Sequence, residues 1–287
     1  MLAVIGGSGF TASQDIKLVD QIDVATPYGK PSSIIDILTV GGQKIALLRR
    51  HGNPATIPPH KVNYRANIYA LKSLGVEQII GTATVGSLKE DIKPLDIVIP
   101  DQGVDRTWGR ESTYFDGGLI VHTGMADPFC PDIRDTFIQC AGALKIKVHN
   151  KSTYVCMQGP QFSTRGESEM HRKLGFDVIG MTLFPEAKLA REAEICYATI
   201  ALVTDYDVWH EHEANVSEEL LLANSRKLQA FAHQIIIEAV PLLATRERKC
   251  NCGNALSNAF GSDLSSLPAD LKKRLDPLIG KYLNKGT

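Results

Sequence analysis

The sequence predicts an α/β protein, with one large domain around a mostly buried β-sheet and a short helical tail. Its 287 residues suffice for one large core and do not require a second domain. Short apolar runs bounded by turn residues, as in buried strands, alternate with stretches that have helical periodicity. Near residue 246 the composition shifts to Cys, Asn, Gly and Ser, so we expect a domain over 1–245 and a cysteine-containing extension over 246–287.

Seven apolar runs have the length and composition of strands. In chain order they are Met1 to Ile5, Lys44 to Leu48, Gln78 to Ala83, Asp96 to Pro100, Tyr154 to Met157, Val178 to Met181 and Tyr197 to Val203. Their spacing leaves room for helices between several of them, which is the order expected of an α/β sheet.

Four segments have helical patterns. Lys61 to Leu74 ends before a glycine, and Pro185 to Ala193 carries proline and Glu186 in its first turn, as helix starts prefer. Ser217 to Leu243 predicts a long amphipathic helix, although Pro241 obscures its end. Leu267 to Leu283 predicts a last helix in the extension.

Charge and composition exclude several classes of protein. The chain carries 31 basic and 32 acidic residues and has no long basic block, which argues against nucleic acid as a partner and favours a small ligand. No uninterrupted apolar stretch reaches membrane-spanning length, and the apolar start is too short for a signal peptide. We therefore expect a cytoplasmic protein without a membrane partner.

The six cysteines are too sparse for a small secreted disulfide scaffold. Cys250 and Cys252 lie one residue apart and lack a second Cys or His pair at zinc-site spacing. The sequence thus predicts no metal site, and a local or longer-range disulfide stays open.

Asp205 and Asp207 follow directly on the uncharged run Ile195 to Thr204. If the chain is still extended there, both carboxylates point to one face, and two close like charges raise one pKa toward that of a proton donor. Solvated carboxylates at a strand end are the ordinary alternative. The pair is the candidate catalytic group.

Three other strand ends are rich in groups that bind anions. Gly6 to Gly9 offers close backbone approach, Arg49 to Gly52 offers a guanidinium fork beside an imidazole, and Thr82 to Ser87 offers hydroxyls. Ligands of open α/β sheets bind at the carboxyl ends of strands, so together these loops predict a phosphate site. The glycines also fit a loose dinucleotide fingerprint, but no amphipathic helix follows and Thr26 to Pro31 breaks the chain, which argues against a nicotinamide enzyme.

Nine segments, taken in order, resemble the purine nucleoside phosphorylase family, most closely the members that act on 5′-methylthioadenosine. They are Ile5 to Gly9, Arg50 to Gly52, His60 to Asn67, Gly86 to Leu88, Asp127 to Pro131, Gly159-Pro160, Met181-Thr182, Pro185-Glu186 and Thr204 to Asp207. The resemblance implies a mixed, partly closed barrel flanked by helices. It also implies phosphorolysis of 5′-methylthioadenosine to adenine and 5-methylthioribose 1-phosphate, with inorganic phosphate as co-substrate and no cofactor.

The resemblance also assigns site residues. Phosphate would be held by Ser8, Arg50, His51, Ala83, Thr84 and Thr182. The nucleoside would contact Phe162, Ser163, Gly180, Met181, Asp205, Asp207, Val216 and Leu220. Family members form homo-trimers or homo-hexamers, in which His122, Thr123 or the tail of a neighbour would complete the site. Heat-loving members have extra disulfides, for which Cys130 with Cys196 and the Cys250 to Cys252 segment are candidates.

Two positions favour adenine as the base. Relatives that act on 6-oxopurines have glutamate and asparagine where this chain has Ser163 and Asp205. Glu218 and Glu219 stand where close relatives have at least one apolar residue, which would admit adenosine as a second substrate.

Two alternatives remain for the function of the protein. One is a purine nucleoside phosphorylase of broader range acting on adenosine, inosine or guanosine, and the other is a silent nucleoside-binding protein.

Overall fold

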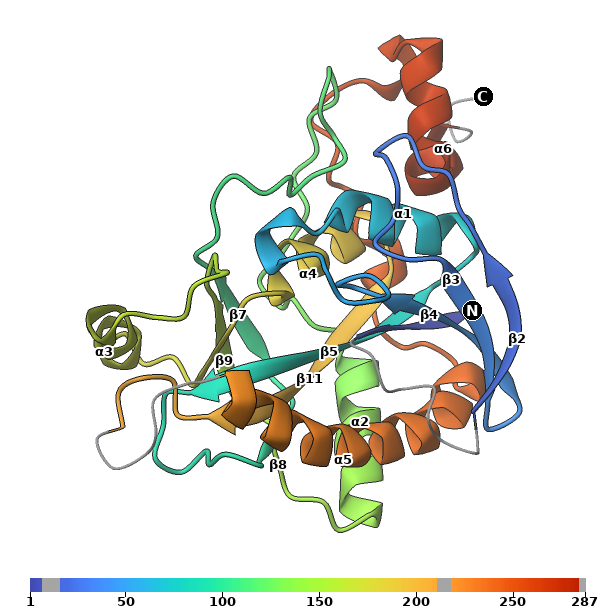
Figure 1. Ribbon diagram of the computed structural model, residues 1–287. Coiled ribbons are helices and arrows are strands. Elements are labelled where there is room, and N and C mark those ends of the chain that lie inside the picture. Colours follow the sequence, from blue (N-terminus) through green and yellow to red (C-terminus); the bar gives the residue numbers. More distant parts are fainter. Residues whose placement is uncertain (7–15, 211–217, 284–287) are drawn as a thin grey trace.

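The computed structural model describes residues 1–6, 16–210 and 218–283, and within them one mixed sheet with helices on both faces (Figure 1). The sheet has eleven strands, and the predicted α/β class is confirmed. Its strands are β1 (Leu2–Gly6), β2 (Ile16–Ile22), β3 (Ile35–Val40), β4 (Gln43–Arg49), β5 (Gln78–Ser87), β6 (Ile97–Val98), β7 (Gln102–Asp105), β8 (Val148–His149), β9 (Thr153–Cys156), β10 (Val178–Gly180) and β11 (Cys196–Asp205).

The sheet divides at β5, and this division creates the space for a ligand. Along one edge, β5 pairs with β11 over almost its whole length, from Gln78 to Gly86. Along the other edge it pairs with β1 only as far as Gly81, and β10 joins that edge only at Gly86. The segment between these two points therefore has a free edge. Among the described strands no pairing joins β7 to β8, so the sheet does not close into a complete barrel.

Helices cover both faces of the sheet (Figure 1). They are α1 (Tyr64–Ser73), α2 (Pro131–Ala143), α3 (Arg165–Lys173), α4 (Leu183–Glu192), α5 (Glu218–Thr245) and α6 (Ala269–Leu283). One face is covered by α5 and α2, which pack on each other, and the other by α1 and α4. Helix α1 begins at Tyr64, three residues later than the predicted start at Lys61, and its N-cap Asn63 accepts a hydrogen bond from the Ala66 amide.

Helix α5 contains the stretch Asn224–Thr245, whose length and mean hydropathy of 1.3 would suit a membrane span. Its apolar side packs against β11 and α2, where Leu228, Ile235 and Ile236 are fully buried. These contacts explain the hydropathy as that of a core helix. The helix continues through Pro241 to Thr245.

Four strands and two helices have no counterpart among the predicted elements. Strand β2 is an exposed edge strand in which Leu18 and Val19 are 57% and 50% exposed, and its apolar residues do not alternate with polar ones as in a half-buried strand. Strand β3 is buried, β7 and β8 have only four and two residues, and α3 buries only Ser168 and His171. Thr26 to Pro31 lies in the connection between β2 and β3, outside every described strand, so the predicted break in the chain is confirmed.

The extension beyond Thr245 packs on its own chain. The amides of Lys249 and Cys250 donate to Asp132 of α2, at 2.8 and 3.0 Å. Farther on, Glu194 accepts from the Leu256 amide at 3.0 Å and forms an ion pair with Lys281 of α6 at 2.6 Å. Helix α6 lies beside α1, as Figure 1 shows.

Candidate active site

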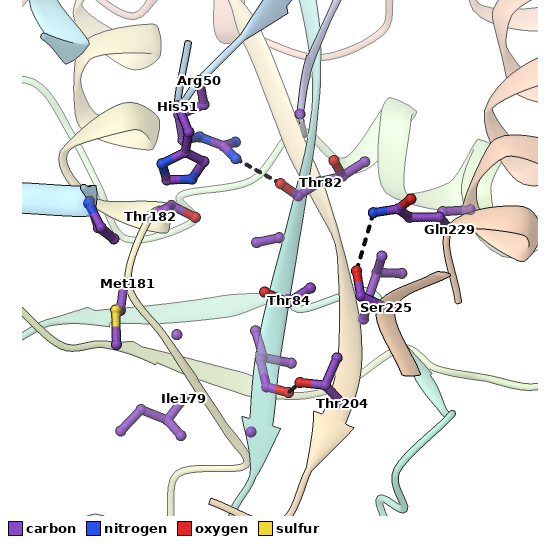
Figure 2. A pocket seen from close by; sticks show the side chains of 18 of the residues that line it. Arg50, His51, Thr82, Thr84, Ile179, Met181, Thr182, Thr204, Ser225 and Gln229 are labelled. Atoms are coloured by element: carbon purple, nitrogen blue, oxygen red, sulfur yellow. Dashed lines mark hydrogen bonds between the residues drawn. The ribbon is translucent and has the colours of Figure 1, made fainter. Parts of the chain in front are cut away.

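A cavity of about 290 Å³ lies where the sheet divides, between the free edge of β5, the ends of β1, β10 and β11, and helix α5 (Figure 2). Ten of the residues predicted from the sequence line it together. They are Arg50, His51, Ala83, Thr84, Phe162, Gly180, Met181, Thr182, Asp205 and Asp207. The chain after β4 and the end of β11 therefore meet in one space, as predicted, but β5 continues to Ser87, so Ala83 and Thr84 lie on the free edge of this strand and not at its end.

Asp205 and Asp207 both line the cavity, but not because the chain stays extended. The pairing of β11 with β5 slips between Val203 and Asp205, and Asp207 adopts a left-handed backbone conformation with φ of 55°. The Asp207 amide then donates to Asp205 Oδ1 at 2.8 Å. A side chain at Gly86 would meet this turn, since its Cβ would lie 2.8 Å from Asp205 Oδ1.

Burial raises the pKa of Asp205 from 3.8 to about 6. Hydrogen bonds from Thr204 Oγ1 and the Asp207 amide oppose this shift, and the Asp207 charge adds least to it. The sequence argument assigned the raised pKa to two like charges, and the structure assigns it mainly to desolvation. A carboxyl with this pKa holds its proton far more readily than an exposed aspartate.

This pKa predicts a pH-dependent gain in stability for Asp205→Asn. The raised pKa favours folding below about pH 4, and this contribution is lost as pH rises through 6, because the buried carboxyl must ionise. Asparagine can accept from the Asp207 amide through its oxygen and donate to Thr204 Oγ1 through its amide nitrogen, and it does not ionise. We expect its unfolding free energy, relative to the wild type, to rise by up to about 3 kcal/mol between pH 4 and pH 7. Urea titrations at several pH values measure this, and a pH-independent difference would contradict it.

Asp207 offers an acceptor to a ligand. Its Oδ2 is buried and has no hydrogen-bond partner among the described residues. Burial raises the pKa of this carboxyl above its ordinary value. A buried acceptor without a partner is costly in a finished core, so its position on the cavity wall suits a ligand that brings a donor.

Arg50 is only 2% exposed, and Glu186 of α4 holds its guanidinium in a bidentate ion pair at 2.7 and 2.8 Å. Arg50 Nη1 also donates to the Thr82 carbonyl at 2.8 Å, and Nη2 reaches the Ile5 carbonyl at 3.4 Å. Burial lowers the pKa of Arg50, but Glu186 raises it by more, so the side chain stays charged. Four of the five guanidinium hydrogens are therefore already used in these bonds, and one hydrogen on Nη1 is left to bind an anion.

His51 is a neutral acceptor in this setting. Its Nδ1 donates to the Ile57 carbonyl at 2.9 Å, because a carbonyl can only accept, so Nε2 carries the lone pair. Burial and the Arg50 charge lower the pKa of the imidazole. The sequence suggested a histidine that donates to phosphate, whereas the free lone pair on Nε2 can only accept a hydrogen bond, as from a protonated phosphate oxygen.

Hydroxyl groups complete the same end of the cavity. Figure 2 shows Thr82, Thr84 and Thr182 around the space below Arg50 and His51. Thr182 immediately precedes α4, in which the backbone is non-helical at Phe184, with φ of −113° and ψ of 139°. These groups can bind three or four phosphate oxygens without a second full positive charge.

The other walls of the cavity suit a flat, partly apolar ligand. Met181 and Ile179 line one side, and Phe162 is 43% exposed on the lining. Ser163 is buried behind the lining, where its hydroxyl lies 3.8 Å from Met157 Sδ. At Gly180 a Cβ would collide with the Tyr154 hydroxyl, so the fold requires glycine there.

Comparison with known proteins agrees with this geometry. The family model of the phosphorylase superfamily matches residues 1–241. The chain belongs to this superfamily. The S-methyl-5′-thioadenosine phosphorylase of Thermofilum pendens is 47% identical over 90% of this chain and 98% of its own.

Two solved phosphorylase structures are similar throughout. A methylthioadenosine phosphorylase from an antarctic soil metagenomic library superimposes with a TM-score of 0.92 at 46% identity, covering 96% of this chain and 98% of its own. Methylthioadenosine phosphorylase from Schistosoma mansoni, in complex with adenine, has a TM-score of 0.86 at 38% identity, covering 91% and 98%.

Several residues of this phosphorylase site were missed by the sequence argument. Helix α5 contributes Ser225, Gln229 and His233, and Gln229 Nε2 donates to Ser225 Oγ at 3.1 Å (Figure 2). Arg110 holds the loop after β10 by donating to the carbonyls of Met181 and Phe184, at 2.8 and 2.7 Å. The spacing of apolar residues in α5 predicted which side of the helix is buried. No local sequence signal shows which residues on that side line a cavity and which belong to the core.

Three predicted residues cannot be placed. Ser8 and Val216 lie outside the described residues, and so does the side chain of Leu220. The predicted roles of Ser8 in phosphate binding and of Val216 and Leu220 around the 5′ group stay predictions.

Proposed function

We propose that the protein catalyses the phosphorolysis of 5′-methylthioadenosine to adenine and 5-methylthioribose 1-phosphate. One observation carries this proposal. A single cavity holds anion-binding groups at one end and two buried carboxyls at the other, with Thr82 next to Arg50 and Gly86 next to Asp205. Four residues of strand separate these ends by about 13 Å. Phosphate, sugar and base can therefore lie in sequence along β5.

The chemistry follows from the two ends. Phosphate at the Arg50 end attacks the anomeric carbon as the bond to N9 of the purine breaks, through a transition state with oxocarbenium character. The electron pair of that bond moves into the purine. Asp205, with its pKa of about 6, donates its proton to N7 and so neutralises the departing base. One oxygen of the phosphate dianion shares its electron pair in the new C–O bond, so the sugar phosphate forms with one negative charge fewer than the dianion, and the proton on Asp205 is restored from solvent.

The carboxyl pair also supports a preference for adenine. Asp207 Oδ2 lacks a partner and can accept from the exocyclic amine of a 6-aminopurine. A 6-oxopurine presents a carbonyl oxygen instead, which would face a carboxylate oxygen without a proton between them. The adenine complex of the Schistosoma mansoni relative agrees with this choice.

We expect phosphate-dependent release of adenine from 5′-methylthioadenosine, and kcat/KM for inosine at least about 100-fold lower. Adenosine serves as the matched control for the base, since it differs from inosine at the 6-position alone. Comparing adenosine with 5′-methylthioadenosine then isolates the 5′ group and tests adenosine as a second substrate. Release of adenine without phosphate, or equal rates with inosine, would refute the proposal in favour of hydrolysis or of a broader nucleoside phosphorylase.

We also propose a cytoplasmic homo-trimer or homo-hexamer that needs no cofactor beyond phosphate as co-substrate and binds neither nucleic acid nor membrane. The balanced charge supports the lack of a nucleic-acid partner. Trp108 and Ile120 are 73% and 55% exposed, which suits an interface with another chain. Native mass spectrometry gives the number of chains directly, and a fully active monomer would contradict the assembly.

A further inference from the structure

Four of the six cysteines lie close together, although they come from three segments that are far apart in the sequence. Cys130 is the N-cap of α2, Cys196 is the first residue of β11, and Cys250 and Cys252 belong to the extension. Their Sγ atoms all lie within 4.8 Å of one another, and three of the four residues are buried. The cavity of the active site contains none of them.

The arrangement of the sulfurs fits one shared centre. Tetrahedral zinc binds thiolates at about 2.3 Å, which places any two of them about 3.8 Å apart. Cys196 Sγ and Cys250 Sγ lie 3.4 Å apart, and the other separations stay below 4.8 Å. Two disulfides would instead bring the sulfurs together in pairs. We propose that these four cysteines bind one zinc ion as a tetrathiolate site, which the one-residue spacing of Cys250 and Cys252 did not predict.

The surroundings are suited to the charge of such a site. Four thiolates and one Zn²⁺ carry a net charge of −2. Arg248 Nη1 lies 3.9 Å from Cys196 Sγ, and Arg191 Nη1 lies 4.0 Å from Cys252 Sγ. Cys130 also stands at the N-terminal end of α2, where the helix dipole stabilises a thiolate. Two guanidinium groups and a helix end thus offset the excess negative charge.

The ion would join the extension to the domain. Of the two ligands in the extension, Cys250 donates its own amide to Asp132, and Cys252 lies between this contact and the Leu256 amide, which donates to Glu194. Because α2, β11 and the extension bring these ligands together only in the folded chain, the free energy of zinc binding adds to the free energy of unfolding. The site is therefore structural, and no open coordination position is needed for the reaction.

The test uses the full chain, expressed without a histidine tag and purified without chelators. Elemental analysis is expected to find about one zinc per chain. The double variant Cys250→Ser/Cys252→Ser is expected to lose the zinc and to unfold at a lower temperature. Cys140→Ser is the matched control, because Cys140 is a buried thiol of α2 outside the cluster. It is expected to retain the zinc.

A second measurement does not depend on any variant folding well. Wild-type protein grown with Co²⁺ is expected to show the visible absorption of tetrahedral Co²⁺ with thiolate charge-transfer bands. Intact mass after alkylation under non-reducing conditions counts free thiols. Two disulfides without metal, four free thiols that take up neither zinc nor cobalt, or unchanged zinc in the double variant would each overturn the proposal. None of these outcomes depends on nucleoside phosphorolysis.

Discussion

Asp205→Asn is expected to lower kcat/KM for 5′-methylthioadenosine by about 10²- to 10⁴-fold, the usual contribution of a general acid. Asparagine fits the same space and can satisfy the same two neighbours, Thr204 Oγ1 and the Asp207 amide, but it has no proton to give to N7. The loss should fall mainly on kcat, since the ground state keeps its contacts. Steady-state kinetics with saturating phosphate measures it.

A control must separate the effect of losing a buried carboxylate from the effect of losing the proton donor of the reaction. Asp36→Asn is the matched control, because Asp36 is also buried and pairs with Arg49 at 2.6 Å, on β3 and outside the cavity. We expect it to lower stability and keep activity within about threefold, whereas Asp205→Asn raises stability near pH 7 and abolishes most activity. An Asp205→Asn enzyme within tenfold of the wild type would show that the proton comes from elsewhere.

Arg50→Met is expected to damage both the fold and phosphate binding. It leaves Glu186 as a fully buried charge without its partner, which costs about 3–5 kcal/mol, or a fall in Tm on the order of 10 °C. It also removes the Nη1 hydrogen that faces the anion end of the cavity. Thermal unfolding and the KM for phosphate report the two effects.

A second variant separates these effects. In Arg50→Met/Glu186→Gln both charges are gone, and the glutamine oxygen still accepts from the Tyr197 hydroxyl, which donates to Glu186 at 2.9 Å. Most of the lost stability should return, while the KM for phosphate stays raised by at least about tenfold. If the double variant also recovered phosphate binding, Arg50 would be a purely structural residue.

Much of the site could be predicted because it directly follows apolar runs, although the residues after Ala83 belong to β5 itself and not to a loop. Apolar runs such as Gln78 to Ala83 mark buried strands, and the small or hydroxyl-bearing residues after them mark the ligand edge of an α/β sheet. Arg50, Thr84 and Asp205 could be identified in this way and lie on the cavity wall. Strand β2 and helix α3 could not, because their exposed faces carry no apolar period.

The partners of the site residues lie far away in the sequence. Arg50 and Glu186 are 136 residues apart, so the sequence could suggest a guanidinium for phosphate but not that most of its fork is already occupied. The same holds for the cysteines, whose spacing alone argued against a metal site. Only the packing of α2, β11 and the extension brings their sulfurs within 4.8 Å.

The sequence by itself determined the α/β class, the phosphorylase family and several residues that line the cavity, because these depend on periodicity and on motifs read over a few neighbouring residues. Only the tertiary structure decided that burial raises the pKa of Asp205, that Arg50 presents a single free hydrogen, and that four thiols share one point. Desolvation and hydrogen-bond partners depend on which distant segments pack together, and no local pattern specifies them.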